Sequence, residues 1–438
     1  MAQGGEAMGR DENGRVVFVP YAIAGEEVAV EITEEKKGYA RGRLVEIRVP
    51  SPARITPRCL HFGLPPSVRP LPPSTPPRVT ARGSAQDAGH SAGDAVENEW
   101  PRGCGGCQWQ HIAYSTQLEF KAQIVRDQFA RIGKITDAPV RPTIGMSEPW
   151  DYRNNIQARM DEKGRLCFLA WDSHNLVRIR ECSIQHPLVY GLFQTIDSSP
   201  AFSMITFRAG TRTGQKMVIL EGKDEEPPEI AVDEPVSIVY ETPEGDLLPL
   251  IGRDAIHEEL RGKTFRVSPT SFFQVNTAMA EQLLNLAERY LEPQPGETLL
   301  DAFSGVGTFG LSLASRVAHV IEVEENPAAV EDARANAVDL ANVDFHVGRV
   351  EQVLPKLNTP IHIAVADPPR AGIDRAALDA LIARAPRALA YVSCDPATLA
   401  RDARRLVDGG YRLVEVQPVD MFPQSYHIES VSLFQSML

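Results

Sequence analysis

The stretch TLLDAFSGVGTFG, residues 298–310, runs from a short apolar strand pattern into a loop with three glycines. Similar strand patterns recur through the last third of the chain and alternate with helical patterns. Such alternation is typical of an α/β fold with an open parallel sheet and helices on both faces. The strand candidates are TLLDAF, AHVIEVE, VDFHVG, IHIAVADPP, ALAYVSC and YRLVEVQPV, and the helical patterns include NPAAVEDARANAV and PATLARDARRLV.

Ligands of such sheets bind outside the carboxyl ends of the strands. The loop DAFSGVGTFG formally matches the GxGxxG pattern of dinucleotide sites, and Glu322 and Glu324 end the next strand, where ribose hydroxyls bind. Both NAD and S-adenosylmethionine fit this pattern, and a tight turn that needs glycines for backbone reasons is the alternative. Asp301 favours S-adenosylmethionine, because a carboxylate repels a pyrophosphate and attracts a cationic amino-acid end.

A cysteine stands at the end of another strand, in YVSCDPATLARD at residues 391–402. A thiol just before a helix N-terminus is expected to have a pKa below the ordinary value of about 8.5. An isolated cysteine is more often a buried structural thiol. Here the glycine loop, Asp367 and Cys394 converge on one sheet edge, which favours a nucleophile.

Methyl transfer to carbon 5 of uracil explains why a nucleophile is needed. That carbon is too weakly nucleophilic to attack a sulfonium, but a thiolate added at carbon 6 turns the ring into an enolate. A base must then remove the proton from carbon 5 so that the thiolate can leave. Glu429, in FPQSYHIES, is the candidate base.

The length of 438 residues indicates about three domains. Residues 1–54 are predicted to form a small antiparallel barrel, because residues 14–50 alternate apolar and polar positions with glycine-bearing turns. Within it, KKGYARGR is either an RNA-binding strip or a solvated hairpin. Residues 55–262 form a central domain with a helix at about 115–131 and a strand-rich part from about 140. Within it, residues 64–102 are rich in Pro, Ser, Ala and Gly and are predicted to be a disordered insertion. Residues 263–438 form the catalytic domain.

The composition is that of a globular protein, and the chain shows no apolar run that could serve as a signal peptide or span a membrane. We therefore expect a cytoplasmic protein without membrane partners, and a monomer by default. The net charge of -13 argues against nonspecific coating of nucleic acid. It does not exclude RNA binding by a local basic patch.

The motifs together resemble the RNA 5-methyluridine methyltransferases, closest to the bacterial 23S ribosomal RNA (uracil-5-)-methyltransferases with an N-terminal TRAM domain and an iron–sulfur cluster. The resemblance spans nearly the whole chain and rests on FFQVN (272–276), DAFSGVGTFG (301–310), EVE (322–324), DPPRAG (367–372), SCDPATLARD (393–402) and FPQSYHIES (422–430).

This resemblance implies Cys394 as the nucleophile and Glu429 as the proton acceptor. It also implies a Rossmann-like catalytic domain, an OB-like TRAM barrel that binds RNA, and S-adenosylmethionine bound by Gln274, Phe303, Thr308, Glu324 and Asp367. The family usually has Asn at the position of Asp395 and often Asn or another polar residue at that of Thr308. We expect the added carboxylate of Asp395 to raise the pKa of the thiol.

Four cysteines form a possible metal site: Cys59, Cys104, Cys107 and Cys182. From the residues alone zinc is slightly favoured over iron–sulfur, with His61 or His111 as further possible ligands. The resemblance instead implies a [4Fe–4S] cluster held by the four cysteines. Cys167 lies in an apolar strand pattern and is expected to be buried and inert.

The expected function is therefore methylation of carbon 5 of a specific uridine, most readily in 23S ribosomal RNA. Transfer RNA is an alternative target, and cytosine carbon 5 methylation an alternative reaction, since it uses the same thiolate chemistry. A noncatalytic RNA-binding factor that retains the fold is the alternative outside enzymes.

Overall fold

The computed structural model describes residues 1–63, 103–171, 173–196 and 199–437. The insertion predicted at 64–102 lies outside them. Contacts divide the chain into two compact units, Met1–Ile112 with Leu169–Val177, and Ala113–Phe168 with Arg178–Leu438. The three-domain division at residues 54 and 262 stays a prediction. No helix of the described residues combines the length and the apolar character that crossing a membrane requires.

The first unit contains a four-stranded sheet in the order β1-β2-β4-β3. It was predicted to be antiparallel, but β2 and β4 run parallel, because β4 returns from the β3 hairpin to lie beside β2. On the hairpin, Lys36, Arg41 and Arg43 pair with Glu34, Glu6 and Glu31, so much of the predicted basic strip is neutralised. The strands are β1 (Ala7–Arg10), β2 (Val16–Val19), β3 (Glu27–Lys36) and β4 (Tyr39–Val49).

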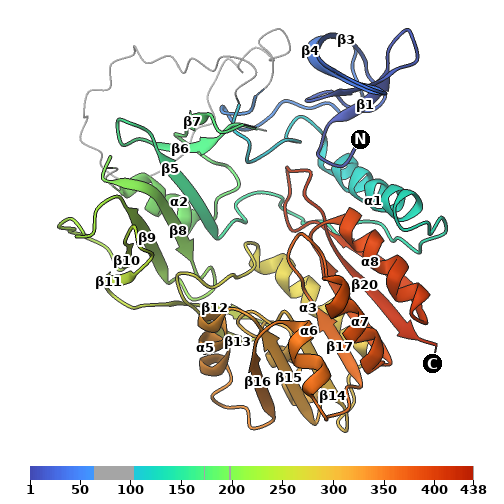
Figure 1. The fold of residues 1–438 in the computed structure, drawn as a ribbon. Helices are drawn as coiled ribbons and strands as arrows, with labels where there is room; N and C mark the ends of the chain where they lie inside the picture. Colours follow the sequence, from blue (N-terminus) through green and yellow to red (C-terminus); the bar gives the residue numbers. More distant parts are fainter. Residues whose placement is uncertain (64–102, 172, 197–198, 438) are drawn as a thin grey trace. The chain divides into compact units, whose positions relative to one another are not determined.

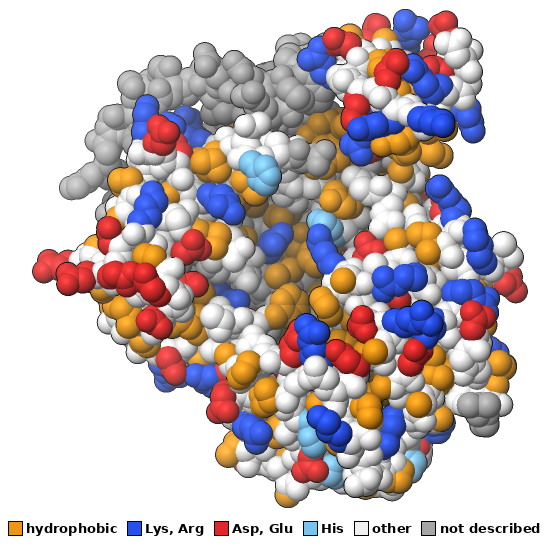
Figure 2. Space-filling view, in the orientation of Figure 1, with side chains coloured by type: hydrophobic (Ala, Val, Ile, Leu, Met, Phe, Trp, Pro, Cys, Tyr) orange, Lys and Arg blue, Asp and Glu red, His pale blue; other side chains and the backbone are white. Residues whose placement is uncertain are grey.

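The middle of the chain forms a strand-rich region, as predicted. A sheet in the order β11-β10-β9-β8-β5-β6-β7 is mostly antiparallel, with a parallel β9–β10 pair. Figure 2 shows acidic side chains gathered on the β9–β10 connection, where Asp224, Glu225 and Glu226 are exposed. The elements are α1 (Tyr114–Arg131), β5 (Asn155–Met160), β6 (Leu166–Leu169), β7 (Leu176–Arg178), α2 (Pro187–Thr195), β8 (Phe202–Ala209), β9 (Lys216–Gly222), β10 (Ser237–Glu241), β11 (Leu247–Ile251), β12 (Ile256–Leu260) and β13 (Lys263–Val267).

The last third forms the predicted α/β sheet, in the order β16-β15-β14-β17-β18-β20-β19. Figure 1 labels β14 to β17 and β20 of this sheet. The elements are α3 (Thr277–Leu291), β14 (Thr298–Ala302), α4 (Gly310–Leu313), η2 (Ala314–Arg316), β15 (His319–Glu324), α5 (Pro327–Asn336), β16 (Val343–Val347), α6 (Val350–Val353), η3 (Leu354–Lys356), β17 (Ile363–Ala366), α7 (Arg375–Arg384), β18 (Ala388–Ser393), α8 (Pro396–Asp408), β19 (Tyr411–Val419) and β20 (Glu429–Ser436).

Five of these strands, β14 to β18, are parallel, and the terminal strand departs from the pattern. β20 lies between β18 and β19 and is antiparallel to both. β17 and β18 are buried along their whole length and lack alternation, as expected for strands covered on both faces. β19 therefore runs in the same direction as β14 to β18, and β20 is the one described strand of this sheet that is reversed.

The helix after Cys394 begins where the sequence predicts. The Asp395 side chain accepts hydrogen bonds from the backbone N–H groups of Ala397 and Thr398, each at 2.9 Å, and Pro396 occupies the first turn. Leu399, Ala403 and Leu406 recur at helical spacing and are buried. This helix, α8, packs against α1, α7 and the last two strands.

Candidate active site

The cysteine and the glutamate that the sequence singles out lie at the same edge of two neighbouring strands. Cys394 directly follows β18, and Glu429 is the first residue of β20. Ser393 of β18 pairs with Ser430 of β20 in antiparallel register. Continuing this register by one residue places Cys394 opposite Glu429, and opposed residues of an antiparallel pair lie on the same face of the sheet. The sheet order thus brings together two residues that are 35 positions apart in the chain.

Glu429 is buried, with 3% of its surface exposed. Burial raises the pKa of its carboxyl well above the usual range, and the charge of Asp367 raises it further, whereas Arg370 lowers it. Its Oε1 has no hydrogen-bond partner among the described residues. A buried carboxyl with a raised pKa and an unused oxygen has the properties of a general base that awaits a substrate.

The Cys394 thiol does not have the lowered pKa that its place before a helix predicts. Burial raises its pKa to about 12, and the charges of Glu429 and Asp367 contribute, while Arg370 acts in the opposite direction. Asp395 was expected to raise it, but this side chain caps α8. The prediction was wrong because burial of the thiol, together with the charges of Glu429 and Asp367, outweighs the helix dipole.

The glycine loop after β14 wraps around buried carboxyl groups. Asp301 is fully buried, and its Oδ2 accepts a hydrogen bond from the Gly310 N–H at 2.7 Å. Its other carboxylate oxygen has no partner among the described residues. Burial raises the pKa of Asp301 to about 8, with contributions from the charges of Asp367 and Glu324.

Gly310 is required here for packing. A Cβ at this position would lie 3.0 Å from the Cβ of Asp301 and would overlap a carboxylate oxygen of Glu322. Glu322 is itself 1% exposed. It therefore lies beneath the loop, whereas Glu324, at the end of β15, is partly exposed.

The other predicted ligand-binding residues surround the same edge. Glu324 accepts hydrogen bonds from the N–H groups of Gly305 and Asn326, at 2.9 and 2.8 Å. Gln274 donates to Asp367 at 3.3 Å, and burial raises the pKa of Asp367 to about 7. Phe303 adopts a left-handed backbone with φ of 67° at the end of β14, and Thr308 lies within the loop.

Phe272 is an aromatic residue that the sequence analysis did not single out. Its side chain is 68% exposed, two residues before the buried Gln274. The signal was present in FFQVN, where two consecutive aromatic residues precede polar ones, but the sequence does not tell which of them is exposed. A large exposed aromatic side chain next to a site is suited to stack on a base.

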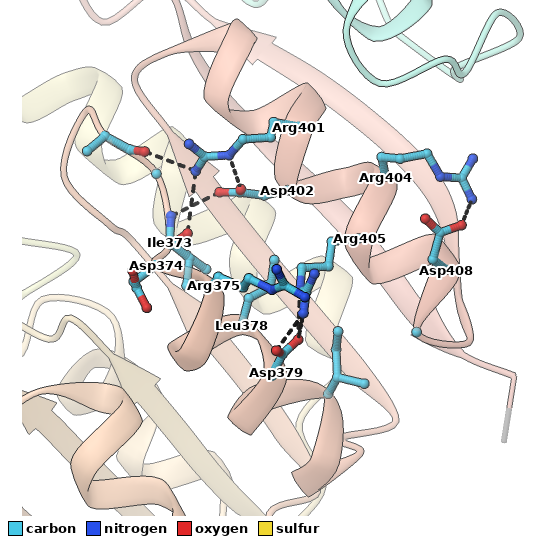
Figure 3. A pocket seen from close by; sticks show the side chains of 14 residues that line it. Ile373, Asp374, Arg375, Leu378, Asp379, Arg401, Asp402, Arg404, Arg405 and Asp408 are labelled. Carbon is cyan, nitrogen blue, oxygen red and sulfur yellow. Dashed lines mark hydrogen bonds and ion pairs between the residues drawn. The ribbon is translucent and has the colours of Figure 1, made fainter.

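A groove between α7 and α8 is separate from this site. It has a volume of about 870 Å3. Ala371, directly after the DPPR segment, is one of its lining residues, but none of the predicted site residues lines it. Figure 3 shows that three of the four arginines that line it are engaged, Arg401 with Asp402, Arg404 with Asp408 and Arg405 with Asp379. Paired guanidinium groups on an open surface do not indicate a second ligand site.

The four predicted metal ligands are divided between the two units of the chain. Cys59, Cys104 and Cys107 belong to the first unit and Cys182 to the second, and none of the four forms a disulfide with another described residue. In the described part of the chain, no group of three or more His, Cys, Asp and Glu side chains is placed to hold a metal ion. The predicted [4Fe–4S] site therefore has no support in the geometry. Cys167 is buried as expected, and burial raises its pKa to about 11.

Comparison with protein families gives two matches. The TRAM domain model matches residues 2–45, and the model described as tRNA (uracil-5-)-methyltransferase matches residues 250–353 and 358–437. An uncharacterized RNA methyltransferase of Thermosynechococcus vestitus is 33% identical, over 98% of this chain and 95% of the relative. Another, of Halalkalibacterium halodurans, is 34% identical, over 97% and 93%.

A solved structure has the same fold over nearly the whole chain. It is the Pyrococcus abyssi tRNA (uracil-54, C5)-methyltransferase in complex with S-adenosyl-L-homocysteine. The TM-score is 0.71 at 24% identity, and the match covers 98% of this chain and 100% of that chain. The α/β fold predicted from the sequence is thereby confirmed.

The raised pKa values of Asp301 and Asp367 predict proton release when a cationic ligand binds. At about pH 7.5 both groups are partly protonated, and a positive charge beside them lowers their pKa, so protons leave. Calorimetric titration in buffers of different ionisation enthalpy should show more protons released by S-adenosylmethionine than by S-adenosylhomocysteine, which lacks the sulfonium charge. Equal release by the two ligands would contradict this description of the site.

Proposed function

The chain belongs to the RNA (uracil-5-)-methyltransferase family and carries a TRAM domain, and we propose that it methylates carbon 5 of a specific uridine in RNA with S-adenosylmethionine as methyl donor. The family and the enzyme class were predicted from the sequence, and both are confirmed. The observation that carries the proposed reaction is the pairing of Ser393 with Ser430, which leaves Cys394 and Glu429 as the next residues on neighbouring strands, together with the influence of the Glu429 charge on the pKa of Cys394.

The first half of the proposed reaction belongs to Cys394. Its thiolate forms a bond to carbon 6 of the uracil ring, and the electrons of the carbon 5–carbon 6 double bond move to give an enolate. Because the resting thiol has a high pKa, it must lose its proton as substrates bind. Arg370 and a cationic ligand both favour the thiolate, since positive charge lowers the pKa of a thiol.

The second half belongs to Glu429. S-adenosylmethionine, when bound, supplies the electrophilic methyl group that carbon 5 takes up. The Glu429 carboxylate then removes the proton from carbon 5, the double bond re-forms, and the thiolate leaves. The raised pKa of Glu429 makes its carboxylate a stronger base than an exposed glutamate, which suits this step.

The methyl donor fits the charges of the loop. The unpartnered buried oxygen of Asp301 and the carboxyl of Asp367 suit the cationic parts of the ligand, and Glu324 suits its ribose hydroxyls. Gln274 holds Asp367 in place by its hydrogen bond. Phe303 and Thr308, on the loop, complete the predicted set.

The RNA is expected to enter with its target base flipped out of any helix, because a thiolate reaches only an exposed ring face. Phe272 supports this, since an exposed aromatic side chain can stack on a neighbouring base. The acidic β9–β10 connection repels phosphate and is an unsuitable part of the RNA path. The TRAM domain is the proposed additional RNA contact.

We propose 23S ribosomal RNA as the target, on the strength of the motif resemblance to the ribosomal branch of the family. The matching family model and the solved structure are both named for transfer RNA, which makes transfer RNA the competing target.

Replacing the proposed nucleophile tests the reaction. Cys394→Ala should lower the rate of methyl transfer about 10³-fold or more, since no thiolate is left to activate the ring. Binding of S-adenosylmethionine, measured by calorimetry, should change by less than about twofold. Cys167→Ala, which removes a buried thiol in another sheet, is the matched control and should retain activity. Methyl transfer by Cys394→Ala at the normal rate would refute the covalent route.

The choice of RNA is tested by supplying unmodified transcripts of 23S ribosomal RNA and of transfer RNA side by side. Methylated uridine, detected by nucleoside mass spectrometry, should form in the ribosomal transcript, because the motif set resembles the ribosomal branch. Loss of one 5-methyluridine from the ribosomal RNA of a deletion strain should identify the position. Methylation confined to transfer RNA would overturn the target assignment but leave the chemistry intact.

The [4Fe–4S] cluster on Cys59, Cys104, Cys107 and Cys182 stays a prediction that rests on the motif resemblance alone. No step of the proposed reaction depends on it. Protein purified without oxygen should be brown and contain iron and acid-labile sulfide if the prediction is correct. Stoichiometric zinc, or protein free of both metals, would exclude the cluster.

A further inference from the structure

A lysine of α1 is completely buried in the second unit. Lys121 has none of its surface exposed, and all three of its ammonium protons have acceptors. The ammonium donates to the Asp420 carboxylate at 2.6 Å, to the Phe422 carbonyl at 3.1 Å and to the His427 carbonyl at 2.7 Å. These acceptors all lie on the segment between β19 and β20, which leads directly into Glu429.

Other side chains from outside this segment hold it as well. The amide group of Gln117, one helical turn before Lys121, donates to the Gln424 side chain at 3.0 Å and accepts from the Gln424 N–H at 3.1 Å. The Tyr152 hydroxyl donates to the Pro423 carbonyl at 3.0 Å. Gln424 itself has a left-handed backbone with φ of 69°, a conformation that non-glycine residues adopt only when their surroundings require it.

Stability alone is a poor reason for burying a lysine here. Burial lowers the pKa of Lys121, which shows that removing the ammonium from water is unfavourable, and Asp420 only partly offsets this. Replacing a buried ion pair by apolar residues is often neutral or stabilising. What an apolar side chain cannot do is fix two backbone carbonyl groups, those of Phe422 and His427, seven and two positions before Glu429.

We propose that Lys121 is a positioning residue, whose contacts with Asp420, Phe422 and His427 set the path of residues 420–428 and so place the Glu429 carboxyl opposite Cys394. This inference rests on the proposed function, in which Glu429 removes the proton from carbon 5. Lys121 touches neither RNA nor methyl donor in this role.

The proposal predicts that one step fails and the others continue. Addition of the thiolate to carbon 6 and methylation at carbon 5 need Cys394 and the donor site, which Lys121 does not contact. If Glu429 is displaced, the proton stays on carbon 5, the double bond does not re-form, and the carbon–sulfur bond is not broken. A methylated RNA that remains covalently bound to Cys394 then accumulates.

The test uses the full chain with ordinary, unfluorinated RNA, taking whichever transcript the unaltered protein methylates. Lys121→Met should lower turnover about 100-fold, the loss that a misplacement of about 1 Å causes. The same variant should accumulate a denaturation-resistant complex with RNA, detected by gel electrophoresis, and bind S-adenosylmethionine within about twofold of the normal affinity. Glu119→Gln, at an exposed position of the same helix, is the matched control and should behave like the unaltered protein.

A double variant separates positioning from folding. Lys121→Met with Asp420→Leu removes both charges and should recover thermal stability that the single variant loses, because no unpaired charge stays buried. Under the proposal it still accumulates the covalent complex, since the two carbonyl contacts are absent. Recovery of normal turnover by the double variant, or loss of adduct formation and donor binding together in both variants, would overturn the positioning role.

Failure of this inference and failure of the proposed function give different results. If the unaltered protein forms 5-methyluridine and the Lys121 variants turn over normally, only the positioning role is wrong. If the unaltered protein forms neither 5-methyluridine nor any adduct, the proposed function is wrong, and the inference with it.

Discussion

Ionisable groups with little access to water lie together at the carboxyl edge of the parallel sheet, and the cost of placing negative charge on them is the constraint on which the rest of the site depends. Burial is the largest cause of the raised pKa values of Asp301, Asp367, Glu429 and Cys394. Nearby negative charge adds to it for all of these groups except Asp367. Such a site favours a cation over an anion, because a positive charge relieves the repulsion that an anion would increase. A sulfonium donor therefore suits this edge, and a pyrophosphate does not.

Chain topology makes this arrangement possible. A parallel strand at the position of β20 would have its last residues at the catalytic edge. Because β20 is antiparallel, its first residue, Glu429, lies there instead. Residues 420–428 connect the end of β19 to Glu429 and contain no helix or strand. Contacts from α1 and Tyr152 take the place of such an element. The proposed base is thus held by residues some 300 positions earlier in the chain, at sequence separations of 307, 299 and 271.

Local patterns predicted the fold class and the sheet edge, because strand and helix periodicities and the glycine loop are properties of neighbouring residues. The position of β20 was not predictable in this way, since an apolar pattern gives a strand but neither its partners nor its direction. The thiol pKa of Cys394 was mispredicted for the same reason, because the burial that raises it, and the charges of Glu429 and Asp367 that add to it, depend on how distant parts of the chain pack. Lys121 was overlooked because a lysine in an amphipathic helix normally faces water. The first unit is another case in which the strand direction was not predictable from local patterns: its sheet was expected to be antiparallel, but β2 and β4 pair in parallel.

The transient bond between Cys394 and a pyrimidine is the central claim, and RNA containing 5-fluorouridine tests it most directly. Fluorine at carbon 5 cannot be removed as a proton by Glu429, so the reaction should stop after methylation with the RNA attached. Mass spectrometry of the digested complex should then find the modified nucleotide on the peptide that contains Cys394, and only when S-adenosylmethionine is present. Methyl transfer without any adduct, or an adduct on another residue, would contradict the account.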